Sequence, residues 1–153
     1  MILVRPILAS LAAALVAALM GLALAACESG GLREQREARI NVYPDRYKTD
    51  LAAAVHTYVA DPTKIRDAYV SDPGIRPIGA QNRYAACVRF NAKNSDGRYL
   101  GSKDLMAIFV AGRFDQFIDP PSPPNPSSLA IEAAEQCKQA EYRRFPELEA
   151  LTR

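Results

Sequence analysis

Hydrophobic and polar positions first fall into a helical pattern near residue 44. Pro44 suits the first turn of a helix, and apolar side chains then recur three or four positions apart. These apolar residues are Tyr47, Leu51, Ala54, Val55 and Tyr58. Asp61-Pro62 should end the helix, because the residue before a proline avoids the helical region. The pattern therefore predicts one helix from Pro44 to about residue 60.

The next part of the chain has the pattern of β-strands separated by turns. In residues 83–92 the set Tyr84, Ala86, Val88 and Phe90 alternates with Ala85, Cys87, Arg89 and Asn91, which predicts a strand with two distinct faces. We expect further strands at residues 65–71, 104–110 and 113–118. The intervening turns are expected at residues 72–74, 94–97 and 111–112. Short turns between consecutive strands predict an antiparallel meander of three or four strands.

A proline run and a second helix follow these strands. Five prolines in residues 119–126 remove backbone donors, so this linker should form neither helix nor ladder. Ser127 or Ser128 can cap the last helix, whose small-residue stripe is Ala130, Ala133, Ala134, Cys137 and Ala140. Residues 145–148 should pack as a C-terminal clamp. The order helix, sheet, helix predicts an α+β domain, and apolar residues on both sides of the strands leave room for helices on both faces.

The N-terminal segment has the pattern of an export signal. Arg5 precedes an apolar stretch from Ile7 to Leu24, which ends in Leu24-Ala25-Ala26-Cys27. This tetrapeptide resembles the lipobox of bacterial lipoproteins. The resemblance implies a signal peptide over residues 1–26, cleavage before Cys27, and a diacylglyceryl group on its thiol. Two alternatives stay open: an uncleaved membrane helix, and ordinary cleavage after Ala23-Leu24-Ala25.

The number of cysteines favours the lipoprotein interpretation. The chain holds three, Cys27, Cys87 and Cys137, which is an odd number for an exported protein. If Cys27 carries lipid, Cys87 and Cys137 remain to pair in an oxidising compartment, and we predict a disulfide between them. The alternative is two buried free thiols that only pack.

Residues 27–43 separate the expected anchor from the expected domain at 44–153. They contain Ser29-Gly30-Gly31 and then alternating charges with few apolar residues, which predicts a flexible tether. In the lipoprotein family, Asp directly after the cysteine favours the inner membrane in enteric bacteria, whereas this chain has Glu28. The resemblance therefore implies a protein facing the periplasm, at the outer membrane rather than the inner one.

Composition and motifs give little indication of catalysis. The net charge is only +2, which argues against nucleic acid as a partner. The single histidine, His56, is expected at the border of the first helix, and no nucleophile elbow accompanies it. No residue pattern indicates a metal site or a cofactor, since the only calcium-like stretch lacks acidic residues at its first and last positions. We therefore expect a protein that is not an enzyme.

The strand ends carry a mixture of basic, tyrosine and asparagine side chains that is typical of interfaces. These residues are Arg89, Asn91, Arg98, Tyr99, Lys103 and Arg113. They form our candidate interaction surface, and the alternative is a solvated rim of the sheet.

Three segments, 88–94, 112–117 and 145–148, resemble small alphaproteobacterial lipoproteins that carry no assigned function. Together with the lipobox, they lead us to expect a membrane-anchored module that binds another envelope protein. One alternative is an accessory role in outer-membrane assembly, which is a fold-level analogy only. The others are an inhibitor of a cell-wall hydrolase, inserting a loop such as residues 93–102, and an undetected hydrolase.

Overall fold

The computed structural model describes residues 31–150 and divides the chain into two units, residues 1–39 and residues 40–153. The predicted signal peptide and the lipidation site at Cys27 lie outside the described residues. Residues 31–40 are helical, where we expected a flexible tether. An ion pair between Arg33 and Glu37, one turn apart at 3.5 Å, is the kind of contact that favours a helix in a charged segment.

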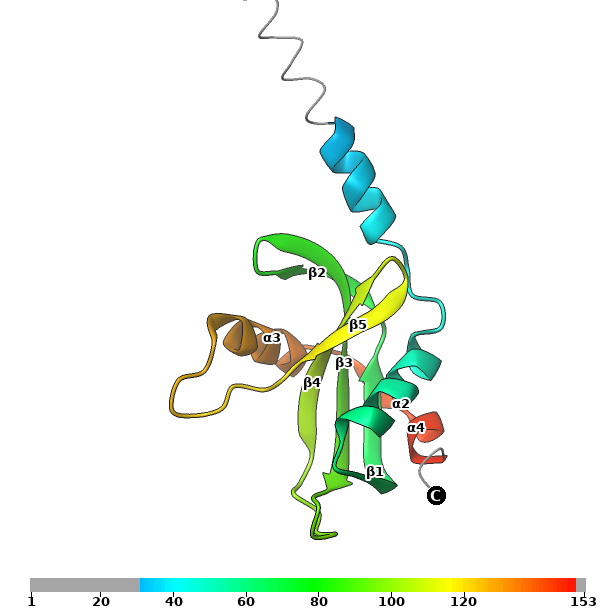
Figure 1. Ribbon diagram of the computed structural model, residues 1–153, viewed down its shortest axis with the longest axis vertical. Helices are drawn as coiled ribbons and strands as arrows, with labels where there is room; N and C mark the ends of the chain where they lie inside the picture. Colours follow the sequence, from blue (N-terminus) through cyan, green and yellow to red (C-terminus); the bar gives the residue numbers. More distant parts are fainter. Residues whose placement is uncertain (1–30, 151–153) are drawn as a thin grey trace, which may run out of the picture. The chain divides into compact units, whose positions relative to one another are not determined.

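The second unit is an α+β domain, as predicted (Figure 1). Among the described residues its antiparallel sheet has six strands rather than three or four, in the order β5-β4-β3-β1-β6, with β2 also paired to β3. The elements are α2 (Tyr47–Tyr58), β1 (Asp61–Ser71), β2 (Gly74–Ile78), β3 (Gln81–Lys93), β4 (Lys103–Val110), β5 (Arg113–Ile118), α3 (Ser128–Lys138), β6 (Tyr142–Arg144) and α4 (Pro146–Ala150).

The first helix begins and ends differently from the prediction. Pro44 precedes α2 in a turn, where its carbonyl accepts a hydrogen bond from the Tyr47 N–H at 3.0 Å. The helix ends at Tyr58, and Asp61-Pro62 opens β1 instead of ending α2. A proline is tolerated at the first residues of a strand, where a missing donor costs little.

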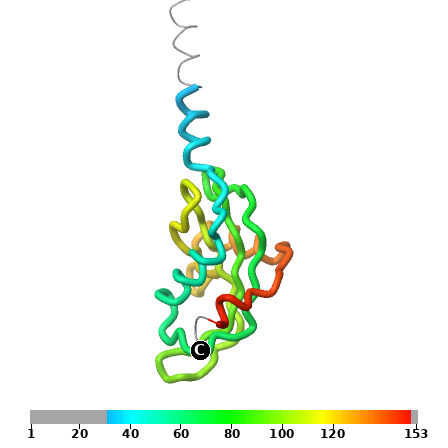
Figure 2. Tube along the Cα trace, turned by 90° about the vertical axis from the view of Figure 1, so that its right-hand side faces the viewer, coloured from blue at the N-terminus to red at the C-terminus, as the bar shows by residue number. Residues whose placement is uncertain are grey.

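Strand β3 lies at the centre of the sheet and presents the two predicted faces. Ala86, Val88 and Phe90 belong to one hydrophobic core, and Ala85 and Cys87 belong to another. The first core also contains Leu51 and Val55 from α2 and Leu148 from α4. Figure 2 shows α4, in red, beside the green strands.

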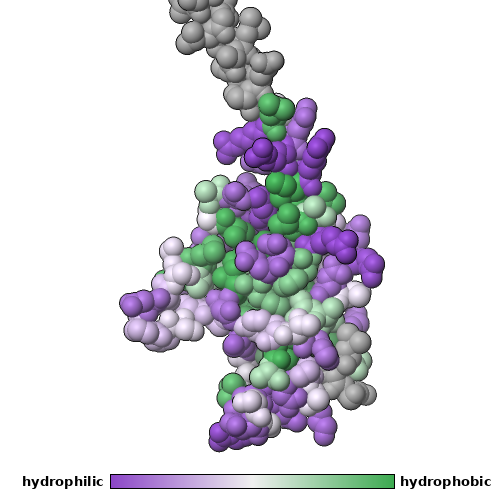
Figure 3. All heavy atoms as spheres, in the orientation of Figure 1, coloured by the Kyte–Doolittle hydropathy of each residue, from purple (hydrophilic) through white to green (hydrophobic). Residues whose placement is uncertain are grey.

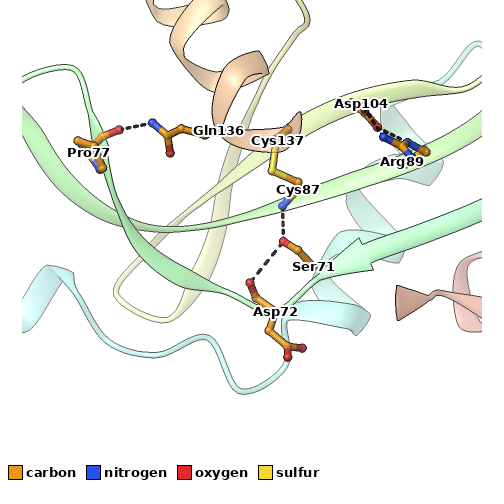
Figure 4. Close-up of a disulfide and its surroundings, with 8 residues drawn as sticks. All are labelled: Ser71, Asp72, Pro77, Cys87, Arg89, Asp104, Gln136 and Cys137. Carbon is orange, nitrogen blue, oxygen red and sulfur yellow. Dashed lines mark hydrogen bonds and ion pairs between the residues drawn. A yellow bond between two sulfur atoms is a disulfide. The ribbon is translucent and has the colours of Figure 1, made fainter. Parts of the chain in front are cut away.

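The second core lies on the opposite face, where α3 contributes Ala133 and Cys137. Helices therefore cover both faces of the sheet. A disulfide joins Cys87 on β3 to Cys137 on α3, with a Cα–Cα distance of 5.5 Å, which confirms the predicted pair (Figure 4). The Ser127 hydroxyl accepts from the Ala130 N–H at 3.1 Å, so the predicted cap of α3 is also confirmed.

Candidate interaction surface

Arg89 projects from β3 toward its cross-strand partner Asp104 on β4. Its Nε and Nη2 donate to the two carboxylate oxygens at 2.6 and 2.8 Å, which makes a bidentate ion pair (Figure 4). The guanidinium also lies 4.4 Å from the ring centre of Tyr142 on β6. Hydrogen bonding to Asp104 raises the pKa of Arg89, and burial, together with the Asp104 charge, raises the pKa of Tyr142 to about 12. Arg89 thus ties three strands together, and 38% of its side chain stays exposed.

Asn91 is mostly buried, unlike the other members of the predicted surface, and only 7% of it is exposed. Its Oδ1 accepts a hydrogen bond from the Gly101 N–H at 3.1 Å. This contact fixes the loop that returns from β3 to β4. The role of Asn91 in the structure is therefore to position this loop.

Tyr99 is the centre of a basic cluster at the tip of the β3–β4 loop. Its hydroxyl donates to the Lys64 carbonyl at 2.6 Å. The Arg66 guanidinium lies 3.5 Å from the ring centre, and the Lys93 ammonium lies 5.6 Å from it. Arg98 lies next to this cluster with 78% of its side chain exposed. The tip is the hydrophilic lower end of the molecule in Figure 3.

Lys103 and Arg113 lie at opposite ends of β4. Lys103 is the first residue of that strand, whereas Arg113 pairs with Val110 at its far end. Seven steps along a strand correspond to about 24 Å. The six predicted residues therefore do not form one surface: Arg98, Tyr99 and Lys103 lie near one end of the sheet, Arg113 lies at the other, and Arg89 and Asn91 are engaged in internal contacts.

Two hollows flank the first residues of β4 and were not predicted. The first has a volume of about 350 Å³ and is bordered by Tyr58, Phe90, Ala92, Lys93, Leu100 and Lys103. The second, of about 480 Å³, is bordered by Leu100, Asp104, Pro120, Pro121, Ile131 and Ala134. Their linings come from segments far apart in the sequence, so strand and helix patterns gave no signal for them.

His56 is exposed on α2 and makes no side-chain hydrogen bond in the described part of the chain. Within residues 31–150, no three His, Cys, Asp or Glu side chains gather closely enough to hold a metal ion. In the same residues, every helix is too short or too polar to cross a bilayer. Comparison with known protein families, characterised proteins and solved structures returned no match to this chain.

Proposed function

We propose that this protein is a lipid-anchored module on the periplasmic side of the outer membrane that binds another envelope protein. The observation that carries the anchor is the pairing of Cys87 with Cys137. This disulfide uses two of the three cysteines and leaves Cys27, the residue that completes the lipobox, as the remaining thiol. A structural disulfide also supports an oxidising compartment.

Metabolic labelling with radioactive palmitate tests the anchor. The chain should incorporate label, and Cys27→Ala should lose it, because the acyl chains attach to that sulfur. Cys137→Ala is the matched control and should keep the label, since it removes a cysteine outside the lipobox. An unlabelled wild-type chain, or a labelled Cys27→Ala variant, would overturn the anchor. If the protein were recovered with inner-membrane vesicles on a density gradient, the proposed location at the outer membrane would be wrong.

The surface of the domain supports a binding role. Six large apolar side chains are exposed among the described residues of the domain, and three of them, Tyr58, Leu100 and Ile131, border the two hollows beside β4. Exposed apolar groups rimmed by basic side chains are typical of binding surfaces.

Crosslinking in intact cells, followed by pull-down of the anchored protein, tests this role. We expect one specific envelope protein, and we expect Arg98→Ala and Lys103→Ala, at the exposed end of the sheet beside the hollows, to weaken its recovery. Lys48→Ala, which removes a basic residue paired with Glu147 on the α2–α4 side, is the control and should leave recovery unchanged. Equal recovery of many abundant envelope proteins would count against a specific partner.

A further inference from the structure

The outer edge of β4 is only partly covered by its neighbour. β4 begins at Lys103, but β5 pairs with it only from Met106 onward, where Met106 faces Ile118. In the part of the chain that the structure describes, no strand pairs with the outer edge of Lys103–Leu105. Figure 1 shows this part of β4 extending below the end of β5. Three residues of strand edge are therefore open.

The proline run explains why β5 stops at this point. Continuing the register of the hairpin would place Asp119 opposite Leu105 and Pro120 opposite Asp104. Proline has no N–H to donate to the ladder, so the pairing ends and the chain turns toward α3. Pro120 and Pro121 then border the second hollow together with Asp104. The prolines keep the edge open instead of covering it.

The two hollows lie on opposite faces of the sheet beside this edge. The first is bordered by Tyr58 of α2, and the second by Ile131 of α3; these helices cover different faces. Successive side chains of a strand point to opposite faces. A strand added to β4 would therefore direct neighbouring side chains into the two hollows in turn.

The side chains around the edge are unusually apolar for a solvated surface. Leu100, which borders both hollows, is 76% exposed, and Ile131 is 46% exposed. A protein rarely leaves large apolar side chains together at an open strand edge, because such an edge pairs readily with other chains. Their presence indicates a surface that is covered by a partner.

The charges at the edge indicate what that partner carries. Asp104 is paired with Arg89, and Glu135 with Lys138 at 2.5 Å, so the two acidic groups bordering the second hollow are neutralised. Lys103 has no acidic partner among the described residues, and its ammonium lies 5.8 Å from the ring centre of Tyr58. A carboxylate on the incoming segment would complement Lys103.

We propose that the open edge of β4 binds an extended segment of another protein, which adds to the sheet as a further strand. The segment carries apolar side chains on both of its faces and an Asp or Glu near Lys103. Main-chain hydrogen bonds supply affinity in this mode, and the pockets for alternate side chains supply specificity. This inference rests on the proposed binding function and names the class of partner.

A library of random decapeptides, selected against the full-length chain in detergent micelles, tests the proposal. Enriched peptides should share two apolar residues an odd number of positions apart and one acidic residue. Fluorescence anisotropy of an enriched peptide should show at least tenfold weaker binding to Leu100→Asp and to Ile131→Asp. Lys103→Glu should also weaken it. Ile75→Asp is the matched control: this exposed side chain on β2 lies at the other end of the sheet, and binding should be unchanged.

Hydrogen exchange identifies the binding mode, because strand addition should slow the exchange of backbone amides within Lys103–Leu105. The proposal is overturned if no peptide is enriched, or if binding is indifferent to Leu100→Asp and Ile131→Asp. The proposal would also be overturned if the protein dimerised with increasing concentration and Leu100→Asp abolished this dimer. In that case the β4 edge would bind a second copy of the same chain. If Leu100→Asp still crosslinks to the envelope partner in cells, the proposed function holds at another surface and only the β4 edge is excluded.

Discussion

Ser71 occupies the position where the neighbour of β3 changes from β1 to β2. The β1–β3 register ends at Val70 opposite Val88, and the β2–β3 register begins at Gly74 opposite Ala85. The Cys87 N–H faces the break between the two strands. The Ser71 hydroxyl accepts its hydrogen bond at 2.9 Å, so a side chain replaces the missing strand partner (Figure 4).

Replacing Ser71 with alanine should destabilise the domain by about 1–3 kcal/mol, because a buried N–H would lose its acceptor. Urea unfolding followed by circular dichroism would show this as a lower midpoint. Ser102→Ala, at an exposed position, is the control and should leave the midpoint unchanged. Equal midpoints for both variants would mean that water or a shifted backbone satisfies the Cys87 N–H.

The β4–β5 turn shows how local backbone geometry determines an element. Ala111 and Gly112 have φ values of +50° and +76°, and the two-residue turn between antiparallel strands was predicted at these positions. Both residues adopt the left-handed region, which a non-glycine residue adopts at a cost. The Ala111 N–H also donates to the Ile40 carbonyl at 2.7 Å. This hydrogen bond fixes the first residue of the domain against the β4–β5 turn.

Ala111→Asn should therefore stabilise the domain by about 0.5–1 kcal/mol, since Asn-Gly is the preferred pair for this turn. Gly112→Ala should have the opposite effect. Its Cβ would lie 3.3 Å from Val42 Cγ1 and 3.4 Å from the Tyr43 carbonyl oxygen, in addition to the strain of a positive φ. Thermal unfolding would compare the two variants with wild type. A lower melting temperature for Ala111→Asn would show that the turn requires alanine for packing.

Sequence patterns predicted the elements whose signals are local. Residues 113–118 form β5 as expected, and the alternation in β3 assigned its two faces correctly. β2 was missed because Pro73-Gly74 and Pro77 are typical of turns, although the segment pairs in register with β3 from Gly74 to Ile78. β6 was missed because it has only three residues and is a strand through its pairing with β1.

The candidate surface was predicted less well than the elements. Lys103 and Arg113 both flank predicted strands, yet the hairpin places them at opposite ends of β4. Asn91 was expected at the surface, but it is buried, and its side chain accepts a hydrogen bond from the Gly101 N–H across the β3–β4 loop. Arg66 completes the contacts of Tyr99, and Tyr142 completes those of Arg89. The pairing of β1 with β3 brings Arg66 there, and the pairing of β6 with β1 brings Tyr142. Contacts between distant segments were the missing information.

At the scale of the whole molecule, the two faces of the sheet are covered unequally. On one face, α2 buries Leu51 and Val55, and the C-terminal segment adds Phe145 and Leu148. On the other face, α3 buries only Ala130, Ala133 and Cys137. Alanine contributes little apolar area, so packing alone holds α3 weakly. The disulfide, together with a hydrogen bond from Gln136 Nε2 to the Pro77 carbonyl at 3.1 Å, supplies the remaining attachment.

Reducing this disulfide should therefore release α3 while the rest of the domain stays folded. The bridge joins residues 50 positions apart. A loop of this length contributes on the order of 4 kcal/mol to stability in the chain-entropy model. Helix α3 depends on the disulfide most, so α3 should open first, since local opening begins where packing is weakest.

Hydrogen exchange of the oxidised and reduced protein would check this order of opening. After reduction, backbone amides of α3 should exchange close to their unprotected rates, whereas those of α2 and of central β3 should stay protected. The double variant Cys87→Ala/Cys137→Ala should behave like the reduced protein without any reductant, which controls for effects of the reagent. Uniform loss of protection would mean that the two faces unfold together. In that case the second core, despite its small residues, would be necessary for the stability of the whole sheet.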